Sequence, residues 1–169
     1  ASDRFVLDTL DADWVRKLYD LPKTIELSSD VLAVHGTPWD DNTYLLEDTA
    51  SGRMAPSARD KVIERLGDSL HWPVILCGHS HRQAVVQIPG GPMILNPGTV
   101  GSPVSPDNPL AAQLEFRSPH ARYAILDRRR GRWGAELFAL PYDCDKAAQR
   151  ATEIASEEWR QSLTIGTVG

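Results

Sequence analysis

Two histidines, His79 and His81, follow a short apolar segment at 74–77, with Gly78 between the segment and the first histidine. A segment this short and aliphatic is typical of a strand that is buried on both faces of a sheet. Two imidazoles one residue apart on a loop can direct their nitrogens to nearby points, and neutral imidazole is the commonest metal ligand in proteins. Taken alone, the pair fits a metal site and equally fits two polar loop residues at the end of a strand.

A third histidine lies in the same kind of position. His35 and Gly36 follow the apolar segment 31–34. Residues 56–66, between the two apolar segments, predict a helix, and a helix that joins two buried strands predicts that these strands are parallel. The carboxyl ends of parallel strands lie at one edge of the sheet, where open α/β sheets bind their ligands. We therefore expect His35 to lie beside His79, and this favours a metal site.

Periodicity and turn residues predict the remaining elements. A helix begins at Asp143 and continues to Ala155, and the tail after Trp159 has no clear element. The other expected elements are a helix at 11–19, a strand at 23–27, one hairpin with strands at 84–88 and 93–95, and a second hairpin with strands at 122–126 and 132–140. No repeat or domain boundary is visible, so residues 1–169 are expected to form a single domain.

The composition excludes several classes of protein. The 169-residue chain has 41% hydrophobic and 24% charged residues and a formal net charge of -5, which is typical of a globular protein and argues against a nucleic-acid partner. No apolar segment reaches the length of a membrane span, and no signal peptide is visible. Cys77 and Cys144 are too few for a disulfide framework, so we expect a cytoplasmic protein without a membrane partner.

Other catalytic motifs fit the same residues less well. Residues 78–82 resemble the nucleophile elbow G-x-S-x-G, but Arg82 occupies a position that needs a small residue, so Ser80 is not expected to be a nucleophile. No Asp-His pair follows His81, as a metallo-β-lactamase-like motif would require. The chain is also too short for the eight βα units of an amidohydrolase barrel. A mononuclear zinc hydrolase that uses three histidines stays open.

The other histidines and the loop aspartates are weaker candidates. His71 and His120 lie in proline-flanked loops without a partner in sequence, and we expect them to be incidental. Asp40, Asp41 and Asp107 are typical turn residues, and we do not expect them to bind metal.

Three motifs together resemble the calcineurin-like metallophosphoesterase superfamily, in particular its small bacterial phosphodiesterase and phosphatase branch. They are V-H-G-T-P at 34–38, C-G-H-S-H at 77–81 and L-N-P-G-T-V-G-S-P at 95–103. The motifs occur in the order found in the family, and the resemblance covers roughly residues 31–140. It implies an α/β fold, namely the C-terminal portion of a metallophosphoesterase-type α/β-β/α sandwich with mixed sheets flanked by helices.

The resemblance also implies a site and a reaction. The metal ligands would be His35, His79 and His81, and the residues that contact substrate or support the ligands would be Gly36, Asn96 and Thr99. The site would hold two divalent metal ions, for which manganese, iron, zinc and nickel are the candidates. The implied function is hydrolysis of a small phosphomonoester or phosphodiester.

The chain departs from the family at its beginning. The motifs D-x-H, G-D-x-x-D and G-N-H-D, which supply carboxylate ligands and commonly the general acid, are absent. We therefore expect the N-terminal third of such a fold, including the general acid, to lie upstream of Ala1. A homo-oligomer, or a partner segment that carries the missing motifs, would restore them. The alternative function is a catalytically inactive scaffold or binding protein of the same fold.

Overall fold

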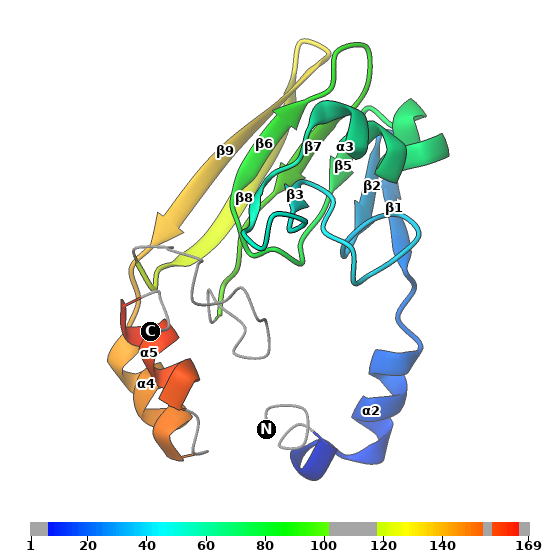
Figure 1. The fold of residues 1–169 in the computed structure, drawn as a ribbon. Coiled ribbons are helices and arrows are strands. Elements are labelled where there is room, and N and C mark those ends of the chain that lie inside the picture. Colours follow the sequence, from blue (N-terminus) through cyan, green and yellow to red (C-terminus); the bar gives the residue numbers. More distant parts are fainter. Residues whose placement is uncertain (1–6, 102–117, 154–156, 166–169) are drawn as a thin grey trace.

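The computed structural model describes residues 7–101, 118–153 and 157–165. A five-stranded sheet with the order β1-β2-β5-β7-β6 forms its centre (Figure 1). The strands of this sheet are β1 (Thr24–Ser28), β2 (Val31–Val34), β5 (Val74–Leu76), β6 (Ala84–Gln87) and β7 (Met93–Asn96). Two short strands, β3 (Glu47–Asp48) and β4 (Ala55–Pro56), pair with each other, and β8 (Ala121–Arg129) forms a hairpin with β9 (Arg132–Leu140).

The three inner strands β2, β5 and β7 are parallel, as the apolar segments and the helix between them predicted. Val74 lies opposite Val31 on one side and opposite Met93 on the other. The outer strands β1 and β6 run antiparallel to their neighbours, so the sheet is mixed. Because the three inner strands end at one edge of the sheet, the loops that follow them leave the sheet side by side.

The connection from β2 to β5 contains helix α3 (Arg59–Leu66) and the 3-10 helix η1 (Gly67–His71). The predicted start of this helix at Pro56 is wrong, because Ala55 and Pro56 form β4. The Ser57 amide donates to the Leu46 carbonyl at 2.8 Å, so the chain is still extended there and the helix begins after Ala58.

Both faces of the central sheet are covered. Successive residues of a strand point to opposite faces, so each inner strand contributes side chains to two hydrophobic clusters. The first cluster, on the α3 side, includes Leu32, Leu45, Leu46, Val62, Leu66, Ile75 and Ile94, and the second, on the hairpin side, includes Val31, Val74, Met93, Leu126 and Trp133. The β8–β9 hairpin, whose two strands were predicted, therefore forms a second layer against the sheet (Figure 1).

Three helices lie away from the sheet at the ends of the described chain (Figure 1). Helix α2 (Ala12–Tyr19) is capped by the Asp11 carboxylate, and none of its residues is buried. Helix α4 (Cys144–Glu153) follows Asp143, as predicted. Helix α5 (Glu157–Ile165) was not predicted, and the interpretation of the tail after Trp159 is wrong. Contacts of α5 with α4, rather than a strong periodicity of its own, stabilise this helix.

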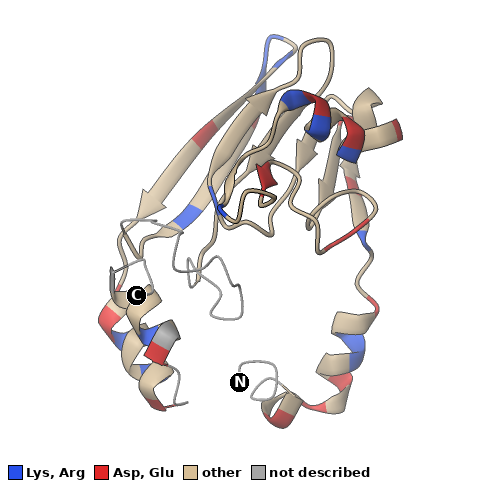
Figure 2. Cartoon of the chain, in the orientation of Figure 1, with Lys and Arg blue, Asp and Glu red and all other residues tan. Residues whose placement is uncertain are grey.

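Charged residues of both signs are mixed along the chain. Figure 2 shows basic and acidic residues alternating on α3 and basic residues at the far end of the β8–β9 hairpin. That hairpin turns at Arg130 and Gly131, which both have positive φ. No helix among the described residues is long and apolar enough to span a bilayer.

Candidate functional site

The parallel pairing of β2 and β5 brings His35 and His79 together. His35 Nε2 lies 3.2 Å from His79 Nδ1, and the two ring centroids are 5.0 Å apart. The Gly78 amide donates to the His35 carbonyl at 2.8 Å, which continues the strand pairing into the two loops. Residues 44 positions apart in the sequence therefore present facing ring nitrogens at the edge of the sheet.

The hydrogen bonds of His79 define which of its nitrogens carries the proton. His79 Nε2 lies 3.2 Å from the Asn42 carbonyl oxygen, which can only accept, so Nε2 is the protonated nitrogen. Burial lowers the pKa of His79 below its usual value, and the neighbouring His35 and His81 lower it further. The ring is thus held neutral, with the Nδ1 lone pair directed at His35. A neutral imidazole with a directed lone pair is the form that binds metal ions.

The loop that carries His79 and His81 has a strained backbone. Their φ angles are 61° and 60°, in the left-handed region that residues with a Cβ seldom adopt. Two such residues separated only by Ser80 cost about 1–3 kcal/mol each, so the surrounding structure must hold them in place. His81 also acts electrostatically on His79, because its positive charge when protonated lowers the pKa of His79.

Asn96 makes the contacts that hold this loop. Its side chain is completely buried at the end of β7. The Nδ2 group donates to the Gly78 carbonyl at 2.8 Å and to the Ser80 hydroxyl at 3.1 Å, and Oδ1 accepts from the Gly98 amide at 2.9 Å. All of these contacts are to the chain itself, so Asn96 supports the loop from behind rather than facing solvent.

Gly36 shapes the loop after β2. A Cβ at this position would lie 2.6 Å from the Thr43 carbonyl oxygen and 2.8 Å from the Asp40 carbonyl oxygen, so only glycine fits. Asp40 is engaged in the same loop, because its carboxylate accepts from the Asn42 amide at 3.0 Å and from the Thr43 hydroxyl at 2.5 Å. It therefore acts as a turn residue in this structure, as predicted.

The remaining candidates lie farther from the facing imidazoles or outside the described residues. The Thr99 carbonyl accepts from the Arg122 amide at 2.8 Å, which joins the loop after β7 to the β8–β9 hairpin. His71 contacts the carbonyl of Asp68 in its own helical turn. Asp107 lies outside the described residues. The roles of Thr99, Gly36 and Asn96 toward a substrate stay predictions.

The facing imidazoles fit a metal ion in part. Zinc–nitrogen bonds of about 2.0–2.1 Å at a tetrahedral angle place two ligand nitrogens about 3.3 Å apart, close to the spacing of His35 Nε2 and His79 Nδ1. Within residues 7–101, 118–153 and 157–165, however, no three His, Cys, Asp or Glu side chains are grouped tightly enough to hold a metal ion. The pair therefore matches one edge of a coordination shell, and the rest of the shell is not assembled in the described part of the chain.

Two residues near the site were missed by sequence reasoning. The ring of Tyr44 stacks on His79 with centroids 4.5 Å apart. Glu47 is buried next to the loop, where its carboxylate hydrogen-bonds the Ser80 hydroxyl. Burial raises the pKa of Glu47, although the hydrogen bond from Ser80 opposes this effect. Neither residue belongs to a periodic pattern, so only the pair of leucines before Glu47 hinted that this loop is buried.

An open groove of about 840 Å³ lies beside His35. Its walls come from α2, β1 and β2 and from the loop after β2. The lining residues include Leu18, Tyr19, Ile25, Val34, His35 and Asp41. The groove is thus mainly apolar, and its polar lining consists of the His35 imidazole, the Lys23 ammonium group and the Asp41 carboxylate.

The fold is similar to those of two solved structures. The chain matches a metallophosphoesterase from Sphaerobacter thermophilus with a TM-score of 0.67 and 19% identity over 95% of this chain and 64% of that chain. It matches a hypothetical protein from Pyrococcus horikoshii with a TM-score of 0.67 and 15% identity over 96% of this chain and 57% of that chain. The chain thus spans about three fifths of the length of these structures.

Comparisons of sequence alone find no counterpart. No model of a known protein family matches the chain, and no curated protein does. The structural likeness confirms the metallophosphoesterase-type α/β fold that the three motifs implied.

Proposed function

We propose that the protein is a metal-dependent phosphoesterase that hydrolyses a phosphomonoester or a phosphodiester. The observation that carries the proposal is the contact of His35 Nε2 with His79 Nδ1 at 3.2 Å, at the sheet edge of a fold similar to that of a metallophosphoesterase. An inactive scaffold would not need two imidazoles with facing nitrogens, so the geometry favours an enzyme over the alternative of a binding protein.

In this proposal His35, His79 and His81 bind two divalent metal ions, with manganese, iron, zinc and nickel as the candidates. The chemistry that divalent ions supply at such a site is to lower the pKa of water and to offset negative charge on phosphoryl oxygens. The chain's own residues keep the His79 imidazole neutral and oriented. The Asn42 carbonyl fixes the tautomer of His79, and Tyr44 covers one face of its ring.

Three imidazoles do not complete a centre for two metal ions. We propose that carboxylate ligands and the general acid come from a further segment, in the same protein or in a partner chain, that lies against this edge of the sheet. The apolar groove beside His35 has room for the organic part of a small phosphoester. Its end, next to the imidazole, would receive the phosphoryl group.

The test is hydrolysis of p-nitrophenyl phosphate and bis(p-nitrophenyl) phosphate, with added Mn²⁺, by the protein together with the segment that supplies the carboxylate ligands and the general acid. We expect turnover of at least one ester by the wild type, its loss in His79→Ala, and wild-type turnover in the control His71→Ala, which removes a histidine outside the site. Turnover by His79→Ala equal to that of the wild type would contradict the proposal, and so would a wild type that hydrolyses neither ester.

A further inference from the structure

A buried chain of hydrogen bonds joins β3 and β7 to the loop that carries His79 and His81, here called the histidine loop (residues 78–81). It runs from Asn96 to the Ser80 hydroxyl and from Ser80 to the carboxylate of Glu47. Glu47 is 5% exposed, Ser80 is 3% exposed and Asn96 is fully buried. Polar groups this deeply buried are expensive to desolvate, so their hydrogen bonds are needed to maintain the fold around them.

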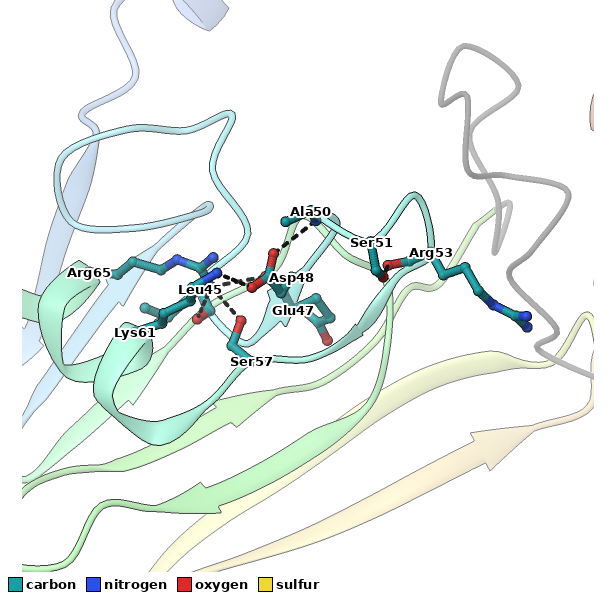
Figure 3. Close-up of polar contacts among 9 residues, drawn as sticks. All are labelled: Leu45, Glu47, Asp48, Ala50, Ser51, Arg53, Ser57, Lys61 and Arg65. Carbon is teal, nitrogen blue, oxygen red and sulfur yellow. Dashed lines mark hydrogen bonds and ion pairs between the residues drawn. The ribbon is translucent and has the colours of Figure 1, made fainter.

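The backbone of Glu47 is anchored on helix α3. Arg65 Nη1 donates to the Glu47 carbonyl at 2.9 Å, to the Leu45 carbonyl at 3.1 Å and to the Ser57 hydroxyl at 2.6 Å. Figure 3 shows these contacts together with the ion pair between Asp48 and Lys61. The main chain on either side of the Glu47 carboxylate is therefore fixed to α3.

The two residues of β3, Glu47 and Asp48, point in different directions and therefore contact different parts of the structure. Asp48 turns toward α3 and pairs with Lys61, whereas Glu47 points away from that pair (Figure 3). The carboxylate of Glu47 hydrogen-bonds Ser80, in the loop that follows β5.

Ser80 lies between the two histidines with left-handed backbone. Its hydroxyl accepts from Asn96 Nδ2, so its own proton is available for the Glu47 carboxylate. Its amide donates to the Gly78 carbonyl at 2.7 Å. The side chain of Ser80 is thus held by a donor on one side and an acceptor on the other, which fixes the residue between the two histidines.

We propose that Glu47 is a positioning residue that acts through Ser80 to hold His79 and His81 in their left-handed conformations. This inference rests on the proposed role of these histidines as metal ligands. Supporting residues that orient metal-binding histidines typically change metal affinity about 10–100-fold when they are removed.

The experiment uses four variants of the 169-residue chain and two measurements. Glu47→Gln keeps an oxygen that can accept from Ser80, whereas Glu47→Leu and Ser80→Ala break the contact. Ser69→Ala is the control, since Ser69 is also buried but lies in η1. The first measurement is the set of imidazole ¹H–¹⁵N resonances of the metal-free chain, with His71 as an internal reference. The second is the Kd for Zn²⁺ by calorimetry.

We expect Glu47→Leu and Ser80→Ala to shift or broaden the resonances of His79 and His81, to leave His71 unchanged, and to raise the Kd for Zn²⁺ about tenfold or more. Glu47→Gln and Ser69→Ala should resemble the wild type. Unchanged resonances of His79 and His81 in both disrupting variants would overturn the inference. A change that moves His71 equally would also overturn it, because it would show a general loss of structure.

The two measurements separate this inference from the proposed function. A wild type that binds no Zn²⁺ would contradict the metal site. The metal-free resonances would still show whether Glu47 positions the histidine loop.

Discussion

Replacement of Asn96 by alanine should destabilise the protein strongly, because its side chain is fully buried and makes three hydrogen bonds. The variant removes two hydrogen bonds donated to Gly78 and Ser80 and one accepted from Gly98, all within 3.1 Å. Buried hydrogen bonds contribute about 1 kcal/mol each, and partners left unsatisfied add to the loss. We therefore expect the free energy of unfolding to fall by about 3 kcal/mol.

The assay is urea denaturation of the metal-free chain at neutral pH, since bound metal would add stability of its own. The control is Gln87→Ala, which removes an amide that also donates two hydrogen bonds to backbone carbonyls, at 3.0 Å each, but from an exposed side chain. We expect the control to lose less than about 1 kcal/mol. The slope of the transition should be the same in all three proteins, because the exposed surface on unfolding does not change.

Asn96→Asp provides a second comparison. An aspartate keeps the oxygen that accepts from the Gly98 amide, but its other oxygen would face the Gly78 carbonyl at the place where Nδ2 now donates. It would also bury a charge, so we expect it to be at least as destabilising as the alanine. A loss below about 1 kcal/mol for Asn96→Ala, or equal losses for Asn96→Ala and Gln87→Ala, would refute the conclusion that Asn96 holds the histidine loop.

Two further predictions concern Gly36, in the loop after β2, and Asp48, in β3. Gly36→Ala should lower the free energy of unfolding by about 3 kcal/mol, because the added Cβ would meet backbone oxygens within 2.8 Å. Gly101→Ala should be neutral in the same urea assay, because a Cβ there would meet no atom of the described residues within 4 Å apart from its chain neighbours. Equal effects of the two substitutions would contradict the packing described for Gly36. A hydrogen bond from Lys61, followed by one from the Ala50 amide, lowers the pKa of Asp48 from 3.8 to about 2. The ionised form is therefore favoured in the fold, and its contribution to stability is complete above pH 3.8 and is lost as the pH falls toward 2. Asp48→Asn should have a lower Tm than the wild type at pH 7 and the same Tm near pH 2, and a difference that persists at pH 2 would refute the role of the ion pair.

The central sheet could be predicted from the sequence because its inner strands are short, apolar and separated by a helix. The apolar segments that form β2 and β5 are too hydrophobic to lie anywhere but inside a sheet. Their parallel pairing follows from the helix that connects them. The contact between His35 and His79 is a direct consequence of that pairing. The two hairpins could also be predicted, because their turns contain glycine and apolar and polar residues alternate along their strands.

Other parts of the structure depend on tertiary contacts that leave no local pattern. Strands β3 and β4 have two residues each, too few for a periodicity of their own, so the start of α3 was placed too early. Helix α5 depends on α4. The contact of Glu47 with Ser80 joins residues far apart in the sequence through their side chains alone. The left-handed conformations of His79 and His81 run against local preference, which is why sequence reasoning did not predict them.

The most direct test of the metal site is calorimetric titration of Zn²⁺ into the metal-free chain, for the wild type, His35→Ala, His79→Ala and the control His71→Ala. If the facing nitrogens of His35 and His79 share a metal ion, the wild type and the control will bind Zn²⁺ with the same Kd. Both site variants will then bind at least about tenfold more weakly. Equal affinity in all four proteins, or no binding by the wild type, would contradict the assignment of these histidines as metal ligands.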